Sequence, residues 1–166
     1  MTMASLRAAS LVSRTDREFS RLSLELGARR DCGQVLMDFV DLAAPTPEPV
    51  VLDALAVRVG GSPLGDDWIA VSRDDAQRLL SRVFARDLGM NASIMSEEDA
   101  GGFARRFLDL FGAQARCFTN TPVLDDEDVD STWTGSWKPL TSATFDTGIA
   151  VVDGPRAGLC WVTDED

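Results

Sequence analysis

Two stretches in the middle of the chain carry apolar residues at the spacing of an amphipathic helix. Each follows a serine, Ser72 or Ser96, that stands three residues before an aspartate, as in a helix-capping box. The apolar stripes then follow the i, i+3, i+4, i+7 rule: Ala76, Leu79, Leu80, Val83, Phe84 and Leu88 in the first, and Ala100, Phe103, Ala104, Phe107, Leu108 and Phe111 in the second. The pattern predicts core-packing helices over Asp74–Leu88 and Glu97–Phe111.

The last part of the chain has the pattern of a β-hairpin. Two apolar, β-branched and aromatic runs, in Phe145–Val152 and Leu159–Val162, flank a turn rich in Gly, Pro and Asp. Ile149–Val152 is apolar on both faces of a strand, which predicts a buried strand in the centre of a sheet.

Alternation of polar and apolar residues predicts further strands. Arg21–Leu26 alternates strictly, so Leu22, Leu24 and Leu26 are expected to point inward. A strand is also expected at Val50–Val59, where Leu55, Val57 and Val59 alternate with Ala54, Ala56 and Arg58. Gln34–Leu42 fits either a helix stripe or a strand, and we favour the strand. Shorter strands are expected at Trp68–Val71 and Ala115–Thr119.

The order of these elements predicts an α+β fold: an antiparallel sheet, two amphipathic helices packed on one face, and the C-terminal β-hairpin within the sheet. Residues 1–166 are expected to form a single domain, in which residues 1–15 are a loose start or a short helix. The proline-rich stretch Ala44–Pro49 and the stretch Gly60–Asp67 are expected to be surface turns.

The composition excludes some classes of function more clearly than it indicates one. The chain is 45% hydrophobic, which is typical of a globular protein, and its net charge of −11 argues against a nucleic-acid or anionic-membrane partner. Two cations and ten acids follow Pro122, so that part of the chain carries −8. An N-terminus without a long apolar run indicates a cytoplasmic protein.

The chain has no histidine, which excludes histidine-containing triads and zinc sites. Cys32, Cys117 and Cys160 are far apart in the sequence, and we expect single thiols in a reducing cytosol rather than a disulfide. We expect no metal and no cofactor.

Two acidic motifs suggest chemistry that their surroundings disfavour. Asp146-Thr147-Gly148 matches the aspartic-peptidase triplet, which needs a second carboxylate and hence a dimer, but Ile149 replaces the usual small residue and no second triplet exists. Asp126, Asp128 and Asp130 match three calcium-loop positions, whereas the loop's glycine and its final glutamate are absent.

The acidic segment that contains this second motif favours protein binding. Acidic residues lie next to two tryptophans, and acids steer a basic partner while tryptophans anchor interfaces. The predicted partner-binding residues are Asp125, Asp126, Glu127, Asp128, Asp130, Trp133 and Trp137, together with the acidic tail Asp164, Glu165 and Asp166. The alternative for the tryptophans is that one or both simply cover the core.

The chain, over about its second half, resembles the small acidic immunity proteins of bacterial toxin–immunity systems. The resemblance lies in a histidine-free acidic domain, a helical pair, and the closing segments Thr144–Gly148 and Trp161–Asp166. It implies a cytoplasmic, non-enzymatic protein that neutralises a cognate toxin by direct complex formation, and it carries over no functional residue. Two alternatives remain: a dimeric aspartic-type hydrolase that uses Asp146, and a structural or assembly subunit.

Overall fold

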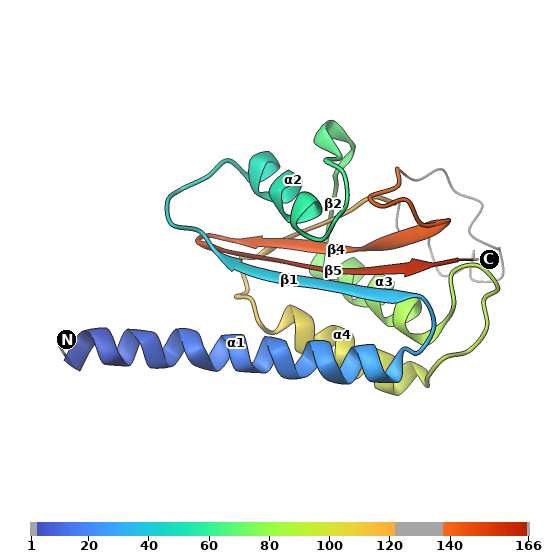
Figure 1. Ribbon diagram of the computed structural model, residues 1–166, viewed down its shortest axis with the longest axis horizontal. Helices are drawn as coiled ribbons and strands as arrows, with labels where there is room; N and C mark the ends of the chain where they lie inside the picture. The colour runs from blue at the N-terminus through green and yellow to red at the C-terminus, as the bar shows by residue number, and fades with distance from the viewer. Residues whose placement is uncertain (1–2, 122–137, 166) are drawn as a thin grey trace.

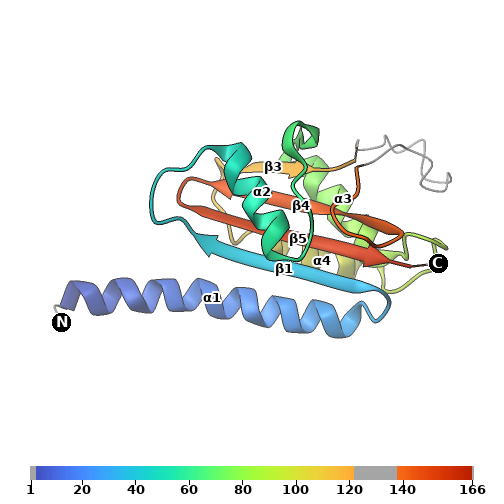
Figure 2. The same ribbon diagram turned by 45° about the horizontal axis from the view of Figure 1, so that its top comes forward.

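The computed structural model describes residues 3–121 and 138–165, with side chains from Arg14 onward. Five strands form one antiparallel sheet that lies between helices on both faces (Figure 1, Figure 2). The helices are α1 (Met3–Arg29), α2 (Glu48–Arg58), α3 (Arg73–Ala85) and α4 (Glu97–Leu108), with a short 3₁₀ turn at Gly65–Asp67. The strands are β1 (Gln34–Asp41), β2 (Ile69–Val71), β3 (Arg116–Thr119), β4 (Phe145–Asp153) and β5 (Arg156–Asp164).

The C-terminal hairpin forms the middle of the sheet, as predicted. The strand order is β1-β5-β4-β3-β2, so β4 is the central strand and Ile149, Ala150 and Val151 are fully buried. Gly154 and Pro155 make the turn, with Asp153 paired to Arg156, and Gly154 has the positive φ of 56° that favours glycine there. The α+β class and the position of the hairpin are therefore confirmed.

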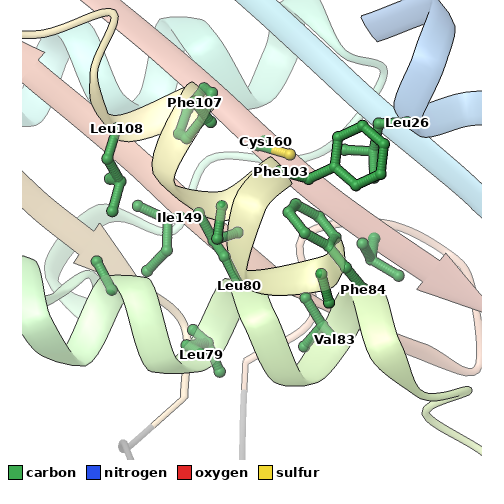
Figure 3. Packing of buried hydrophobic residues seen from close by; sticks show 14 of the residues in the cluster. Leu26, Leu79, Leu80, Val83, Phe84, Phe103, Phe107, Leu108, Ile149 and Cys160 are labelled. Atoms are coloured by element: carbon green, nitrogen blue, oxygen red, sulfur yellow. The ribbon is translucent and has the colours of Figure 1, made fainter. Parts of the chain in front are cut away.

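The two helices predicted from their apolar stripes are α3 and α4. Ser72 Oγ accepts a hydrogen bond from the N–H of Asp75 at 3.0 Å, and Ser96 Oγ accepts one from Asp99 at 3.1 Å, so both caps form. Both helices end about one turn earlier than the stripes suggested, at Ala85 and Leu108. Their stripes pack on one face of the sheet, where Leu80, Phe84 and Phe107 meet Ile149 and Cys160 (Figure 3).

The predicted strand at Arg21–Leu26 is wrong, because these residues belong to α1, a helix of 27 residues that also includes most of the expected loose start. Leu22 and Leu26 are buried and Leu24 is 77% exposed, so the inward positions are i and i+4 rather than i, i+2 and i+4. Leu22 and Leu26 join the core formed with α3 and α4. The strict alternation was misleading because the helix buries only Leu22 and Leu26 and leaves Leu24 in solvent.

The predicted strand at Val50–Val59 is also wrong, and the segment is α2. Its buried residues are Val51, Leu52, Leu55 and Ala56, a helical set, while Val57 is 56% exposed. Prolines at Pro47 and Pro49 suit a helix start, where the first N–H groups have no partner within the helix. α2 covers the second face of the sheet, where it packs against Leu159 and Trp161.

Candidate functional site

The outer edge of β1 is a free edge of the sheet, because no strand in the described part of the chain pairs with it. Successive residues of an antiparallel strand turn their backbone groups to opposite sides. The two-residue turn makes Asp153 and Arg156 a hydrogen-bonded pair, so the even-numbered residues of β5 bond to β4 and the odd-numbered ones bond to β1. Those odd residues lie opposite the even-numbered residues of β1. The odd-numbered residues of β1 therefore turn their N–H and C=O groups away from the sheet.

Two backbone contacts at the end of β1 agree with this assignment. Leu42, an even-numbered residue, donates its N–H to the carbonyl of Pro155 at 2.6 Å, toward the hairpin. Phe39, an odd-numbered residue, donates its N–H to Asp38 Oδ1 at 2.9 Å and not to β5. Arg58 of α2 holds that carboxylate at 2.5 and 3.1 Å. Asp38 and Arg58 thus occupy the edge at Phe39 and leave the outward groups of Val35 and Met37 open.

A groove runs along this open part of β1. One hollow, of about 340 Å³, lies over Val35–Asp38 between Ser23 of α1 and Arg58 of α2. A second hollow, of about 360 Å³, is lined by Gly33, Gln34, residues 141–143 and Glu165. The two hollows share Leu36 and Val59, so they adjoin each other along the strand. We call this feature the edge groove.

One end of the edge groove is electronegative. Glu165 is exposed, and its carboxylate accepts hydrogen bonds only from the N–H and hydroxyl of Thr144, at 3.3 and 2.7 Å, among the described residues. The C-terminal end of α2, at Val59 and Gly60, lines the same hollow, and the carbonyls at a helix C-terminus favour positive charge. This end of the groove therefore favours a cation.

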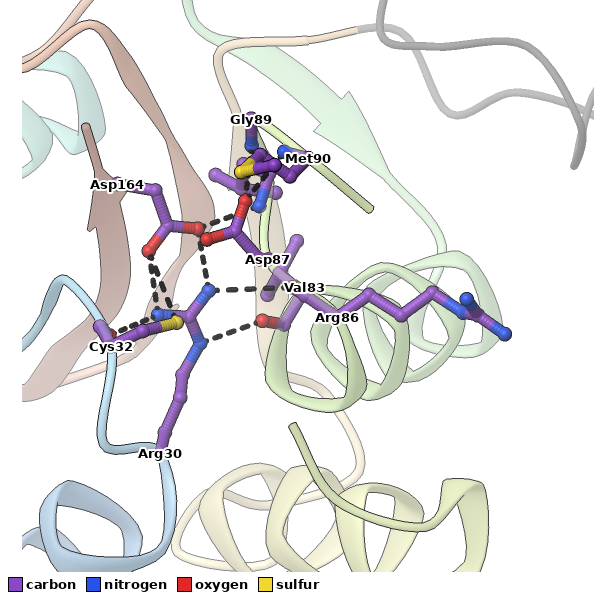
Figure 4. Close-up of polar contacts among 9 residues, drawn as sticks. Arg30, Cys32, Val83, Arg86, Asp87, Gly89, Met90 and Asp164 are labelled. Carbon is purple, nitrogen blue, oxygen red and sulfur yellow. Dashed lines mark hydrogen bonds and ion pairs between the residues drawn. The ribbon is translucent and has the colours of Figure 1, made fainter. Parts of the chain in front are cut away.

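A buried ion pair holds the two strands that carry the groove. Arg30, at the end of α1, donates to both carboxylate oxygens of Asp164, at 2.8 and 2.7 Å, and both side chains are at most 1% exposed (Figure 4). Arg30 also donates to the carbonyls of Cys32, Val83 and Arg86. The N–H of Leu88 donates to Asp164 Oδ2 at 2.7 Å. The start of β1 and the end of β5 are thereby fixed to α1 and to the segment after α3.

Asp164 was predicted to belong to an exposed acidic tail, and that prediction is wrong. It faces a cation that lies 134 residues earlier in the chain, and the pairing buries both groups. Gly33 lies against this pair with φ at 60°, and a Cβ there would come within 2.2 Å of Asp164 Oδ1 and 1.9 Å of the carbonyl oxygen of Thr163. The chain therefore requires glycine where it passes Asp164 into β1.

Cys32, Asp87 and Asp164 bring three possible metal ligands within 4.8 Å of one another. The guanidinium of Arg30 already occupies the position beside both oxygens of Asp164, and one oxygen of Asp87 accepts from the N–H groups of Gly89 and Met90. Burial raises the pKa of the Cys32 thiol, which opposes the thiolate that binds metal. The cluster is built as an ion pair and not as a cation site.

The other two cysteines are buried and unpaired, and all three are free thiols, as predicted from their spacing. Burial raises the pKa of both Cys117 and Cys160. These two thiols are packing groups of the core between the sheet, α3 and α4.

Asp146 of the peptidase-like triplet is buried and fully hydrogen-bonded. Its carboxylate accepts from the N–H groups of Leu140 and Thr141, the Thr141 hydroxyl, Trp161 Nε1 and Asn120, at 2.8 to 3.3 Å. The hydrogen bonds from Leu140 and Thr141 hold the segment before β4 against the sheet. Both oxygens of the carboxylate already accept hydrogen bonds, and the described residues bring no second carboxylate to it.

Most of the predicted partner-binding residues lie outside the described part of the chain. These are Asp125, Asp126, Glu127, Asp128, Asp130, Trp133, Trp137 and Asp166. Of the remaining two, Asp164 is buried, and Glu165 is exposed at the end of the edge groove. Sequence reasoning missed the groove, although the ambiguous stretch Gln34–Leu42 carries a clue: a strand with acids at Asp38 and Asp41 is unusual in a sheet centre and typical of an edge.

No family model, no curated protein and no solved structure matches this chain. Among the described residues, no helix is both long and apolar enough to cross a membrane.

Proposed function

We propose that this protein is a non-enzymatic binding protein that neutralises a basic protein toxin by forming a direct complex through an acidic surface. The observation that carries the proposal is an open groove at a free strand edge on a chain of net charge −11. An unpaired strand edge offers main-chain hydrogen bonds to another polypeptide, and the net charge favours a basic one. The resemblance to small acidic immunity proteins supplies the class of partner.

The hydrolase alternative is weaker because its one candidate catalytic group, the Asp146 carboxylate, accepts structural hydrogen bonds. A catalytic carboxylate must reach substrate or water, and both oxygens of Asp146 already accept hydrogen bonds from protein donors. The assembly-subunit alternative shares the open strand edge but predicts self-association. A charge of −11 on each copy opposes that outcome at low ionic strength.

The test is co-expression with the product of the neighbouring gene, followed by surface-binding kinetics. Rescue of growth together with a stable complex would support the proposal, and rescue without a complex would contradict it. Because long-range attraction accelerates encounter, raising the salt concentration is expected to lower the association rate more than it raises the dissociation rate.

The same kinetics test the predicted acidic segment. Converting Asp125, Asp126, Glu127 and Asp128 to their amides is expected to slow association. The matched control converts four exposed acids from other parts of the molecule: Asp16, Asp66, Glu97 and Glu98. Truncating Trp133 or Trp137 to alanine is expected to accelerate dissociation at a cost of about 2 kcal/mol or more if that side chain is an anchor. Equal effects of the two charge sets would show that net charge alone acts.

A further inference from the structure

We propose that the free edge of β1 binds an extended segment of the partner as an added strand, and that a lysine or arginine of this segment lies beside Glu165. This inference rests on the proposed function for the basic character of the partner. It adds the mode of binding and the site, and both are defined by residues that the structure describes.

The backbone of β1 supports an added strand over a short length. Val35 and Met37 each present an outward N–H and C=O, so four backbone groups are available to a neighbouring strand. The open stretch ends at Phe39, whose N–H is already bonded to Asp38. The edge groove lies over this same open stretch. An added segment of three or four residues therefore has both its hydrogen-bond partners and its space.

The walls of the edge groove determine which side chains fit. Side chains of an added strand alternate between the two faces of the sheet. Those directed toward α1 would lie beside Ser23, and those directed toward α2 would lie in the hollow that contains Leu36, Val59 and Glu165. None of the described cations forms an ion pair with Glu165, so its carboxylate is open to a cation from outside.

A second copy of this chain is a less suitable occupant. Pairing two β1 edges would bring together two molecules of net charge −11. Two molecules that both carry a large negative charge repel each other, whereas a basic segment is attracted. The charge therefore selects a basic segment over self-pairing.

The experiment uses the full chain and two designed probes of six residues each, one alternating lysine with valine and one alternating glutamate with valine. Binding is measured by titration, and amide exchange is followed residue by residue. The lysine probe is expected to bind and to slow exchange of the Val35 and Met37 amides at least about tenfold, since each gains a hydrogen bond. The glutamate probe is expected not to bind. Saturable binding without protection of these amides would overturn the proposal.

Val35→Pro tests the added strand directly. Proline removes an N–H that the sheet itself does not use, a substitution that edge strands tolerate. The variant is expected to weaken binding of the lysine probe by about tenfold, the equivalent of a main-chain hydrogen bond or two. Asp41→Pro is the matched control, because its N–H also points outward but lies beyond the groove, and Asp41→Asn accounts for the lost charge. Equal binding by Val35→Pro and the wild type would overturn the proposal.

Two further variants keep the test informative if Val35→Pro fails to fold. Ser23→Gln narrows the groove from α1 without a change of charge and is expected to weaken binding. Glu165→Gln is expected to weaken binding of the lysine probe about threefold and to reduce its salt dependence, whereas Glu98→Gln, on an exposed site of α4, leaves both unchanged. Unchanged binding in both groove variants would overturn the proposal.

The outcomes separate this inference from the proposed function. If a toxin binds but the groove variants bind it like the wild type, the binding mode is wrong and the function stands. If the lysine probe binds in the groove but no complex forms with the neighbouring gene product, the site stands and the toxin-neutralising function fails.

Discussion

Two aspartates in this protein have structural roles that their sequence context does not indicate. Asp146 and Asp164 both occur in motifs that suggest exposed or reactive groups, and both are buried with full sets of hydrogen-bond donors. Asp146 receives neutral donors from the chain around it, whereas Asp164 receives a cation. The consequence of losing each carboxylate should therefore differ.

Asp164→Ala is expected to destabilise the protein by about 3–5 kcal/mol, because it leaves the guanidinium of Arg30 buried without its counter-charge. Urea unfolding followed by circular dichroism measures the change. Glu165→Ala is the neighbouring control, and as an exposed position it should shift the free energy of unfolding by about 0.5 kcal/mol or less. Equal losses from the two variants would contradict the ion-pair account.

Asp146→Asn is expected to cost about 1–3 kcal/mol, because either orientation of the amide places its NH₂ group against a backbone N–H donor, that of Leu140 or that of Thr141. The folded variant should keep partner binding, since Asp146 acts on the structure of the segment before β4. A folded variant that lost a hydrolytic activity of the wild type would instead support the hydrolase alternative.

At the scale of elements, α1 depends on its contacts with α4 and the sheet. Leu22 and Leu26 enter the core, Arg29 pairs with Asp99 at 2.6 Å, and Arg106 pairs with Glu25 at 2.5 Å. The two ion pairs are exposed and contribute little each, so the leucines supply most of the attachment.

Leu22→Ala is expected to destabilise the protein by about 2–5 kcal/mol, and Leu24→Ala by about 0.5 kcal/mol or less. The first side chain is 1% exposed and the second 77%, although both stand in the same alternating run. Chemical denaturation of the two variants measures the difference. Comparable losses would mean that this run pairs as a strand.

At the scale of the whole molecule, ion pairs between arginines and carboxylates make stability depend on pH. Hydrogen bonds from arginines lower the pKa of three carboxyl groups: Arg106 acts on Glu25, Arg78 on Asp75 and Arg29 on Asp99. A lowered folded-state pKa means that the unfolded chain binds more protons in acid. The stability that these pairs contribute is thus present above the ordinary values of 4.5 for Glu and 3.8 for Asp and is lost as the pH falls below them.

The free energy of unfolding is therefore expected to decline as the pH falls from about 5 to 3, and Asp99→Asn should make that decline shallower while lowering stability at neutral pH. Glu98→Gln is the matched control on the same helix, and it should leave the steepness of the decline unchanged. Denaturation series at several pH values measure both. An unchanged decline in Asp99→Asn would contradict the role of the Arg29 pair.

The sequence by itself determined the features whose information is local. Two serine caps with helical stripes placed α3 and α4, and a glycine–proline turn between apolar runs placed the β4–β5 hairpin. In each case the residues that define the element lie within a few positions of one another, so propensity, capping and hydrophobic period agree.

Only the tertiary structure decided the features that depend on distant partners. Arg21–Leu26 and Val50–Val59 alternate like strands, but the sheet buries a helical subset of each, and packing outweighs so short a pattern. Arg30 meets Asp164 across 134 residues. The free edge of β1 exists because β5 pairs with only one side of it, and the order of strands in a sheet is set by how whole elements cover the core.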